Sequence, residues 1–361
     1  MKILSLVDST HPKVLGATLT VLRSGGLIIF PTETTYGAGV DALNPAAVQK
    51  LLSYKARREG KPLSIAVRDL EMAEKYVEVN ESARRVYERF LPGPVTVVSK
   101  SKGNVAPGVE SEFGTLGVRI PDYPFVLELL AAFGGPITAT SANQSGSKSP
   151  YSVQELLLDL SEKQKSQIDL IIDAGELPHN PPSTVIDTTL STPVVFRQGD
   201  VEVMKPQKTT TLTSHSEQET KDIAKRLILK HWNDVKECGL VIGLNGSLGM
   251  GKTIFAKGVA EFLQIPRVVT SPTYTYLEEY PFERHGVTGK FYHVDAWKIN
   301  SDAEMELLRF SDLPKPNQVV VVEWVSNVAL YIKKLKTEQK FSYLEITFGG
   351  QDHERTLEIK E

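Results

Sequence analysis

Short apolar segments alternate with amphipathic ones along the first 200 residues. Val, Ile and Phe cluster in six short runs that predict strands, and periodic apolar positions between several of them predict helices. The predicted strands are 25–30, 62–67, 94–99, 170–173, 184–187 and 194–197, and the predicted helices are 45–54, 81–91, 124–133 and 152–160. Strands interleaved with helices indicate an α/β or α+β domain.

The remaining residues have a clearer order of elements. A predicted helix at 218–232 precedes an apolar strand at 239–243, and a Gly-rich turn then leads into a helix from Lys252. Two further apolar strands are predicted at 290–294 and 318–323. Strand, Gly-rich turn and helix form the start of a P-loop unit, so this part of the chain is also predicted to be an α/β domain.

A polar stretch separates the two parts. Residues 205–222, KPQKTTTLTSHSEQETKD, lack a large apolar cluster and have the composition of a solvated connector. We therefore place the boundary near Lys205, which gives domains of residues 1–205 and 206–361. The chain of 361 residues is long enough for two such domains.

The charge balance argues against binding of nucleic acid through bulk charge. Residues through Lys205 contain 21 basic and 23 acidic side chains, and the rest of the chain contains 20 basic and 21 acidic ones. A domain that binds nucleic acid by its overall charge has an excess of Lys and Arg. Contact with RNA would therefore need a local basic patch.

Hydropathy and cysteine content narrow the class of protein further. No apolar run reaches the 18 or so residues of a membrane-spanning helix, and Asp8 interrupts the N-terminus before a signal-peptide core could form. Cys238 is the only cysteine, which excludes a disulfide framework. We expect a cytoplasmic protein with no membrane partner.

A phosphate-binding loop is predicted between the apolar strand and the helix of the second part. The segment GSLGMGKT fits the pattern G-x-x-x-x-G-K-[ST] in this context. Its backbone N–H groups can surround the β-phosphate, Lys252 can reach the β and γ oxygens, and Thr253 can ligate Mg²⁺. The predicted ATP-binding residues of the loop are Gly246, Ser247, Leu248, Gly249, Met250, Gly251, Lys252 and Thr253.

Two acidic residues follow apolar strands of the same part. Glu323 ends VVVVE, and Asp295 follows FYHV. A P-loop enzyme needs an acidic group near its metal ion, usually at the end of a neighbouring strand, although either residue could be an ordinary strand-end carboxylate. Thr273, in the loop TSPT, lies where P-loop ATPases often have a segment that orders around the γ-phosphate.

Together these segments resemble the TsaE family, small P-loop ATPases that serve bacterial tRNA threonylcarbamoylation. GSLGMGKT, VVTSPTYTYLEEY, FYHVDAW and VVVVEW occur in the family's order within about residues 211–361. The resemblance implies Thr253, Glu323 and Asp295 at Mg²⁺, with Asp295 also the acid or base near the attacking water. The other residues it implies at the nucleotide are Thr273 in the switch loop, Trp324 beside the nucleotide and Arg355 near the phosphates.

The first part contains a cationic cluster and a polar segment. Lys55, Arg57 and Lys61 occur in YKARREGKPLSIAV, where Gly60 and Pro62 end a helix before a strand. A solvated basic loop is the alternative interpretation of this cluster. The segment TSANQSG, after the apolar PITA, supplies small hydrogen-bonding residues or a plain polar turn.

Six ordered blocks across about residues 8–203 resemble the YrdC-type threonylcarbamoyl-AMP synthases. They are PTETTYGAGVDA, YKARREGKPL, LPGPVTVV, GTLGVRIPD, TSANQSG and PSTVIDTT. The family implies a twisted, mixed α/β sheet domain that binds ATP, with Thr32, Arg119 and Ser183 toward L-threonine. The residues it implies around ATP and the carbamate are Lys55, Arg57, Ser141 and Asn143, and those it implies toward ATP alone are Lys61, Thr115, Ser149 and Arg197.

The reaction implied by this resemblance needs cations. The amine of L-threonine and bicarbonate give a carbamate, which attacks the α-phosphate of ATP and expels pyrophosphate, so that negative charge accumulates on all reactants. Preorganised Lys and Arg donors stabilise these oxygens, and each charge-assisted hydrogen bond is worth about 1.5–3 kcal/mol.

The two resemblances predict a fusion of a synthase domain with a P-loop ATPase domain, which acts in the biosynthesis of threonylcarbamoyladenosine at tRNA position 37. Transfer to tRNA would require a complex of a TsaD-type transferase with its TsaB-type companion. One alternative is an RNA-binding module coupled to a regulatory ATPase. Another is a small-molecule kinase, although only five Arg follow Lys205, too few for the expected Arg-rich lid.

Overall fold

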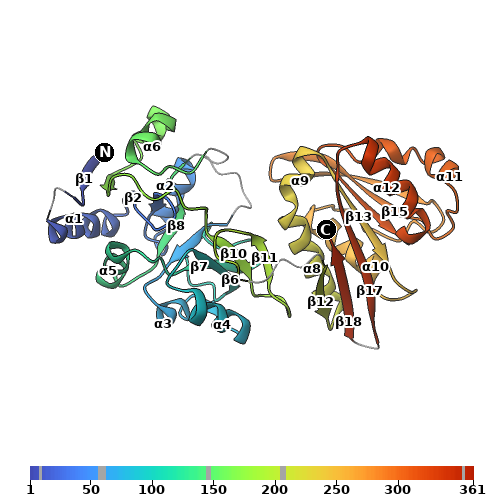
Figure 1. The fold of residues 1–361 in the computed structure, drawn as a ribbon, viewed down its shortest axis with the longest axis horizontal. Coiled ribbons are helices and arrows are strands. Elements are labelled where there is room, and N and C mark those ends of the chain that lie inside the picture. The colour runs from blue at the N-terminus through green and yellow to red at the C-terminus, as the bar shows by residue number, and fades with distance from the viewer. Residues whose placement is uncertain (8–9, 56–61, 144–147, 204–208, 352–353) are drawn as a thin grey trace. The chain divides into compact units, whose positions relative to one another are not determined.

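The chain folds as two compact α/β units. The structure is a computed structural model that describes residues 1–7, 10–55, 62–143, 148–203, 209–351 and 354–361. The first unit comprises residues 1–189 and 193–205, and the second comprises residues 190–192 and 206–361. Each unit is built on its own sheet with helices packed against it (Figure 1), so the predicted α/β class is confirmed for both.

The first unit has a mixed sheet with the strand order β1-β9-β2-β3-β8-β4-β7-β6-β10-β11, and β5 pairs with β6. The ten elements predicted here are present, with ends that differ by up to three residues. The strands are β1 (Lys2–Ser5), β2 (Ile28–Phe30), β3 (Gly37–Gly39), β4 (Ser64–Ala66), β5 (Val77–Glu78), β6 (Val95–Ser101), β7 (Thr115–Arg119), β8 (Ile137–Ser141), β9 (Leu170–Asp173), β10 (Thr184–Asp187) and β11 (Val194–Arg197). The helices are α1 (His11–Arg23), α2 (Pro45–Tyr54), α3 (Leu70–Ala73), α4 (Glu81–Phe90), α5 (Pro124–Phe133), α6 (Val153–Asp159) and α7 (Glu162–Lys165).

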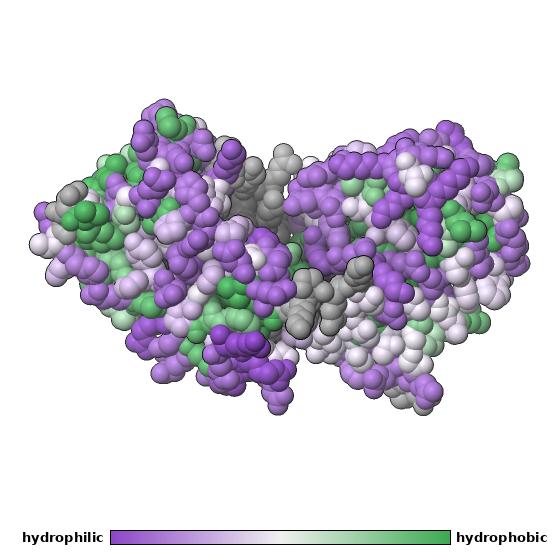
Figure 2. All heavy atoms as spheres, viewed as in Figure 1, coloured by the Kyte–Doolittle hydropathy of each residue, from purple (hydrophilic) through white to green (hydrophobic). Residues whose placement is uncertain are grey.

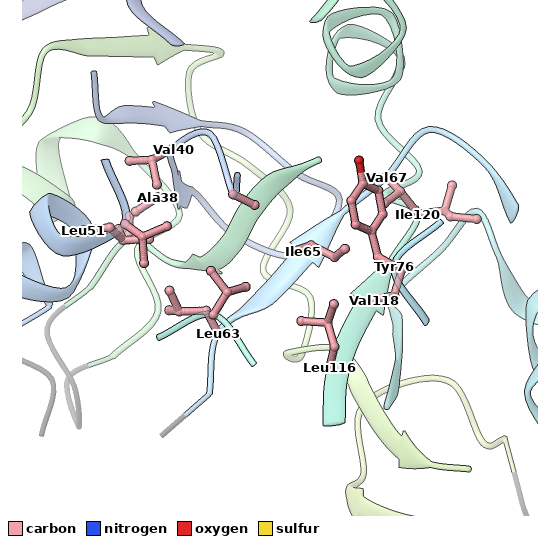
Figure 3. Packing of buried hydrophobic residues seen from close by; sticks show 14 of the residues in the cluster. Ala38, Val40, Leu51, Leu63, Ile65, Val67, Tyr76, Leu116, Val118 and Ile120 are labelled. Atoms are coloured by element: carbon pink, nitrogen blue, oxygen red, sulfur yellow. The ribbon is translucent and has the colours of Figure 1, made fainter. Parts of the chain in front are cut away.

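The two faces of this sheet differ in side-chain size along β3, β4, β6 and β7. On one face, Ala38, Ile65, Val97 and Val118 join a buried core with residues of α2 and α4, part of which is shown in Figure 3. Successive residues of a strand point to opposite faces. The adjacent positions, which face the other way, are small residues: Gly37, Ser64, Thr96 and Gly117. Small side chains leave room on that face for a ligand.

Helix α2 has clear signals at both ends. Asn44 caps its start, because the Asn44 side chain accepts hydrogen bonds from the backbone N–H groups of Ala46 and Ala47 at 3.0 and 3.2 Å. Pro45 occupies the first turn, where its missing N–H costs nothing. The helix ends at Tyr54, as predicted, and Lys55 follows directly.

The second unit has the strand order β12-β18-β17-β13-β16-β15-β14. Strands β17, β13, β16 and β15 are parallel neighbours at its centre, and the outer strands pair antiparallel. The strands are β12 (Thr209–Ser214), β13 (Leu240–Asn245), β14 (Leu277–Arg284), β15 (Val287–Asp295), β16 (Gln318–Glu323), β17 (Ser342–Gln351) and β18 (Glu354–Lys360). The helices are α8 (Glu217–Lys230), α9 (Trp232–Glu237), α10 (Lys252–Phe262), α11 (Asp302–Leu307), η1 (Phe310–Asp312), η2 (Val325–Val328) and α12 (Ala329–Glu338).

The apolar run of β16 is buried on both faces, as expected for a central parallel strand. Val320 and Val322 pack in one core with Ile332 and Leu335 of α12. Helices α8 and α10 pack against each other, and α10 contacts β16. The four predicted elements from 239 onward and the helix predicted at 218–232 are all present, the last as α8.

The prediction of a solvated connector at 205–222 is wrong for most of the residues there that the structure describes. Residues 209–214 form β12, which pairs with β18 over six residues, and α8 begins at Glu217. The run of Thr is compatible with a strand because β-branched side chains fit a pleated surface. Leu212, its single apolar residue, is fully buried.

Polar residues cover most of the visible face of each unit, and apolar residues appear there in small groups (Figure 2). Among the described residues, no helix combines the length and the hydropathy needed to cross a membrane. Cys238 is a free, buried cysteine.

Candidate active sites

A cavity of about 290 Å³ opens over the small-residue face of the first sheet. Loop residues before β3, the strands β4, β6 and β8, and the ends of β7 and β11 contribute to its wall. The predicted site residues that line it are Thr32, Arg119, Ser141, Ser149, Ser183 and Arg197. Six residues predicted from separate sequence blocks are thus brought to one cavity.

The hydroxyl of Thr32 organises the loop between β2 and β3. Thr32 Oγ1 donates to the carbonyl of Thr35 at 2.7 Å and accepts from the backbone N–H groups of Thr34 and Thr35, each at 3.2 Å. These bonds close a tight turn at the cavity wall. Thr32 therefore shapes the site as well as lining it.

Arg119, at the end of β7, forms a largely buried ion pair with Glu33. The distance from its guanidinium Nη2 to Glu33 Oε1 is 2.8 Å, and the two side chains are 12% and 16% exposed. The same nitrogen donates to Thr34 Oγ1 at 3.0 Å. The sequence interpretation missed Glu33, although the block PTETTYG contains it, because an acidic residue is unexpected beside a site for anions.

Arg197 and Ser183 form a second polar group on the cavity wall. Arg197 Nε donates to the Ser183 carbonyl at 2.9 Å, and Nη2 donates to Ser183 Oγ at 3.0 Å. Loss of hydration and the nearby charge of Arg119 lower the pKa of Arg197 from its usual value. No carboxylate of the described chain pairs with Arg197, so the cavity keeps a positive charge that an anion could neutralise.

Lys55 lies beside the S-x-N segment, as the resemblance implied. Its side chain is 3% exposed, and its ammonium donates to the carbonyl oxygens of Ser141, at 2.7 Å, and Asn143. A solvated basic loop is therefore the wrong interpretation for Lys55. Arg57 and Lys61 lie outside the described residues.

Two of the predicted site residues, Thr115 and Asn143, do not line the cavity. Thr115 points to the same face of β7 as Gly117 and Arg119 but does not line the cavity, and its hydroxyl is 2.7 Å from Ser111 Oγ. Asn143 is 7% exposed, and its carbonyl oxygen accepts a hydrogen bond from Lys55.

In the second unit, the turn between β13 and α10 has the backbone that a phosphate-binding loop requires. Gly246 and Gly251 have φ angles of +134° and +101°, in the region that favours glycine. A Cβ atom on Gly246 would lie 2.8 Å from the carbonyl oxygen of Phe348, and one on Gly251 would lie 3.4 Å from Arg355 Nε. Arg355 on β18 therefore lies against this loop.

Parallel pairing brings the two predicted carboxylates to the same edge. Asp295, the last residue of β15, pairs in register with Glu323, the last residue of β16, and Glu323 pairs with Leu244 of β13. The cavity there has a volume of about 440 Å³. Predicted residues that line it are Leu248, Gly249, Gly251, Lys252, Thr253, Thr273, Asp295, Glu323 and Trp324. Gly246, Ser247 and Met250 belong to the same loop but do not line the cavity.

Lys252 is held by its own loop. Its ammonium donates to the carbonyl oxygens of Gly246 and Ser247 at 2.7 and 2.9 Å and lies 3.8 Å from the centre of the Trp324 ring. Burial lowers the pKa of Lys252, while the carboxylates of Glu323 and Asp295 act in the opposite direction. If the ammonium bound a phosphate, it would exchange these neutral carbonyl acceptors for charged phosphate oxygens.

A chain of three side chains runs through Glu323. Thr253 Oγ1 donates to Glu323 Oε1 at 2.9 Å, and His293 Nε2 is 2.9 Å from the same oxygen. The exposed fractions of the His293 and Glu323 side chains are 0% and 4%. His293 was missed at the sequence level because nothing local to FYHVD indicates which strand its ring meets.

Asp295 holds the loop that contains Thr273. Asp295 Oδ2 accepts from Thr273 Oγ1 at 2.9 Å and from Ser271 Oγ at 3.2 Å, and Oδ1 accepts from the backbone N–H of Trp297 at 3.0 Å. The ring centre of Trp297 lies 4.4 Å from that of Trp324. Ser271 and Trp297 are further cavity residues that the sequence interpretation did not assign.

The oxygen atoms at this edge fit Mg²⁺. The Thr253 hydroxyl and the Glu323 carboxylate are hard ligands of the kind that Mg²⁺ prefers, and the ion usually keeps waters and phosphate oxygens as its other ligands. Within the described parts of the chain, no group of three His, Cys, Asp or Glu side chains forms a rival metal site.

The geometry defines two α/β units, one with a cavity lined by Arg119 and Arg197 and one with a P-loop. Comparison with known families agrees. The family model Sua5_yciO_yrdC, described as Telomere recombination, matches residues 20–199, and the model described as Threonylcarbamoyl adenosine biosynthesis protein TsaE matches residues 214–357. The chain belongs to the Sua5/YciO/YrdC family through its first unit and carries a TsaE domain in its second.

Individual relatives support this assignment. The chain is 37% identical over 205 residues to a putative threonylcarbamoyl-AMP synthase of Methanocaldococcus jannaschii, which covers 57% of this chain and 95% of that protein. It is 33% identical over 195 residues to the threonylcarbamoyl-AMP synthase of Bacillus subtilis, covering 54% of this chain and 55% of that protein. It therefore spans only about half the length of the latter.

Two solved structures resemble the chain. The crystal structure of Escherichia coli YciO matches with a TM-score of 0.50 and 30% identity, over 56% of this chain and 96% of that one. The structure of Pyrococcus abyssi Sua5 complexed with L-threonine matches with a TM-score of 0.52 over 95% of this chain and 98% of that one, but at 22% identity it supports the fold alone.

Proposed function

We propose that the first unit makes threonylcarbamoyl-AMP and pyrophosphate from L-threonine, bicarbonate and ATP. The observation that carries this proposal is the meeting of Lys55 with the Ser141 and Asn143 carbonyls next to a cavity that contains Arg119 and Arg197. Identity of 37% to a putative synthase over 205 residues supports it. In the reaction, the carbamate oxygen bonds to the α-phosphorus as the bond to pyrophosphate breaks.

Each polar group has a distinct task in this proposal. Arg119, oriented by Glu33, binds the carboxylate of L-threonine, with Thr32 and Ser183 beside it. Arg197 and Ser149 bind ATP, together with Thr115, Arg57 and Lys61. Lys55 fixes the Ser141–Asn143 segment against the reacting groups. Positive charge at the cavity wall stabilises the phosphate oxygens of ATP as negative charge moves toward the departing pyrophosphate.

We further propose that the second unit hydrolyses ATP. Thr253 and Glu323 would hold Mg²⁺, which neutralises phosphate charge when bound. Lys252 and the loop from Gly246 bind the phosphates, Trp324 lies beside the nucleotide and Arg355 lies near the phosphates. Asp295 orients the attacking water and, through Thr273, links the switch loop to the site.

The product of the first unit is a mixed anhydride that needs a transferase. We propose that a TsaD/TsaB-type complex transfers the threonylcarbamoyl group to adenosine 37 of tRNA, and that ATP hydrolysis by the second unit supports that complex. A connection between the units can raise the local concentration of one active site at the other to about millimolar.

The test uses the Lys252→Ala variant of the full chain with ATP, L-threonine and bicarbonate. Mass spectrometry should detect threonylcarbamoyl-AMP, and pyrophosphate should form in equal amount, only when all three substrates are present. Folded protein that binds ATP but makes neither product would exclude the synthase. This result matters because YciO of Escherichia coli, 32% identical over 193 residues and described only as an uncharacterized protein, belongs to the same family.

A further inference from the structure

We propose that His293 is a positioning residue for the metal ion of the second unit. It orients the Glu323 carboxylate through a hydrogen bond from Nε2, so that Glu323 and Thr253 face the metal together. This inference rests on the proposed ATPase site. It gives a function to a buried residue that contacts neither the nucleotide nor the metal ion.

The direction of the hydrogen bond follows from the chemistry of the partners. A carboxylate that holds a metal ion only accepts hydrogen bonds, so in this role Glu323 takes the hydrogen bond from His293 Nε2, 2.9 Å from Glu323 Oε1. His293 Nδ1 is buried and has no hydrogen-bond partner within the described residues. The hydrogen bond to Glu323 is therefore the polar contact that this ring makes.

A purely structural role does not explain a histidine at this position. The ring is fully buried on β15 and stacks on Phe291, with ring centres 6.2 Å apart and an angle of 20° between planes. A phenyl ring would pack there without the cost of burying two ring nitrogens. Glu323 is the group that gains from the imidazole, because a buried carboxylate oxygen without a hydrogen-bond donor costs free energy.

Both donors act on one oxygen of Glu323. Thr253 Oγ1 and His293 Nε2 are each 2.9 Å from Oε1, so they approach it from the P-loop side and from β15. Two directional bonds to one oxygen fix the rotation of the carboxylate. Replacement of a group that orients a metal ligand in this way typically lowers metal affinity or activity 10- to 100-fold.

The test measures metal and nucleotide binding separately on the full chain. Mn²⁺ affinity is measured by electron paramagnetic resonance with saturating ADP, and ADP affinity is measured by calorimetry in EDTA. We expect His293→Phe to weaken Mn²⁺ binding about ten-fold or more while ADP affinity in EDTA changes less than two-fold. His293→Gln, whose amide can still donate, should retain most of the Mn²⁺ affinity.

Phe291→Leu is the matched control, because it disturbs the same stack without removing the hydrogen bond. It should leave Mn²⁺ affinity unchanged. Equal weakening by Phe291→Leu and His293→Phe, or no weakening by His293→Phe, would overturn the proposal. If His293→Phe does not fold, His293→Asn replaces it, since its shorter amide cannot reach Glu323, and the same two outcomes apply. If the Lys252→Ala variant binds ADP and Mn²⁺ as tightly as the wild type, the measured binding belongs to the first unit and the proposed ATPase site has failed instead.

Discussion

Lys55, the residue that follows α2, donates a 2.7 Å hydrogen bond to the carbonyl oxygen of Ser141 at the end of β8. Two blocks that lie 86 residues apart in the sequence are thereby joined at one cavity. We expect Lys55→Ala to lower the rate of adenylate synthesis by about 100-fold, because the Ser141–Asn143 segment loses the ammonium that fixes it and small misplacements of catalytic groups have effects of this size. ATP hydrolysis by the second unit should be unchanged.

Lys252→Ala is the reciprocal variant of this pair. It should abolish ATP hydrolysis and leave adenylate synthesis within about two-fold of wild type, because Lys252 lies in the phosphate-binding loop of the second unit. Pyrophosphate and phosphate release are measured in parallel for both variants. Loss of both activities in either variant would contradict the assignment of one site to each unit.

The ion pair of Arg119 with Glu33 should contribute to both stability and substrate binding. Glu33→Ala leaves a largely buried guanidinium without its carboxylate, and we expect a loss of about 3 kcal/mol in the free energy of unfolding. The KM for L-threonine should rise more than kcat falls, because Arg119 loses the group that orients it. Urea unfolding followed by circular dichroism, together with steady-state kinetics, measures these effects.

The matched control for that variant is a surface ion pair of the same unit. Glu74 lies 2.6 Å from Arg84, and their side chains are 41% and 47% exposed. Glu74→Ala should change the free energy of unfolding by less than about 1 kcal/mol, since exposed pairs contribute little. If the two variants lost similar amounts of unfolding free energy, burial of the Arg119–Glu33 pair would make no contribution to stability.

Residues 209–214 provide a test of the strand that replaces the predicted connector. Leu212 is fully buried, whereas its neighbour Thr211 is exposed. Leu212→Ala should lower the free energy of unfolding by about 2–4 kcal/mol, and Thr211→Ala should change it by less than about 0.5 kcal/mol. Neutral results for both would restore the interpretation of this stretch as a solvated connector.

Glu361 should make the stability of the second unit depend on acid pH. The imidazole of His231, whose Nε2 lies 3.7 Å from Glu361 Oε1, and a hydrogen bond from Lys230 lower the pKa of Glu361 from 4.5 to about 2. A lowered pKa stabilises the folded state above the unfolded pKa, and this contribution is lost as the pH falls from about 4.5 toward 2. Because 46% of the side chain is exposed, we expect an effect below about 1 kcal/mol.

The measurement compares wild type with Glu361→Gln by urea unfolding at pH 7, 5 and 3. The difference in free energy of unfolding between the two proteins should be constant from pH 7 to pH 5 and smaller at pH 3. A difference that grows toward pH 3 would contradict the direction of the pKa shift.

The second site was largely predictable because its parts are local or follow from strand direction. GSLGMGKT carries the loop within eight residues, and the apolar runs before Asp295 and Glu323 place both carboxylates at the carboxyl edge of a parallel sheet. His293 could not be predicted in this way. Its contact with Glu323 depends on which strand lies next to β15, and the local sequence does not specify strand order.

The first site was predictable as a set of residues but not as a set of contacts. The ordered blocks indicated Lys55, Ser141 and Arg119, yet the ion pair with Glu33 arises only once the loop after β2 folds around Thr32. Among the strands, β3 was missed because Gly37, Ala38 and Gly39 form no apolar run. Pairing with β2 and β8, rather than composition, makes this segment a strand.

The placement of Trp297 and Trp324 has a practical consequence. These two and Trp232 are the only tryptophans of the chain, and all three belong to the second unit. Tryptophan emission, excited at a wavelength that tyrosine does not absorb, therefore comes from the second unit alone, with two of its three sources at the cavity beside the P-loop. No tryptophan reports directly on unfolding of the first unit, so a chain whose synthase half has unfolded can still give the tryptophan spectrum of a native protein.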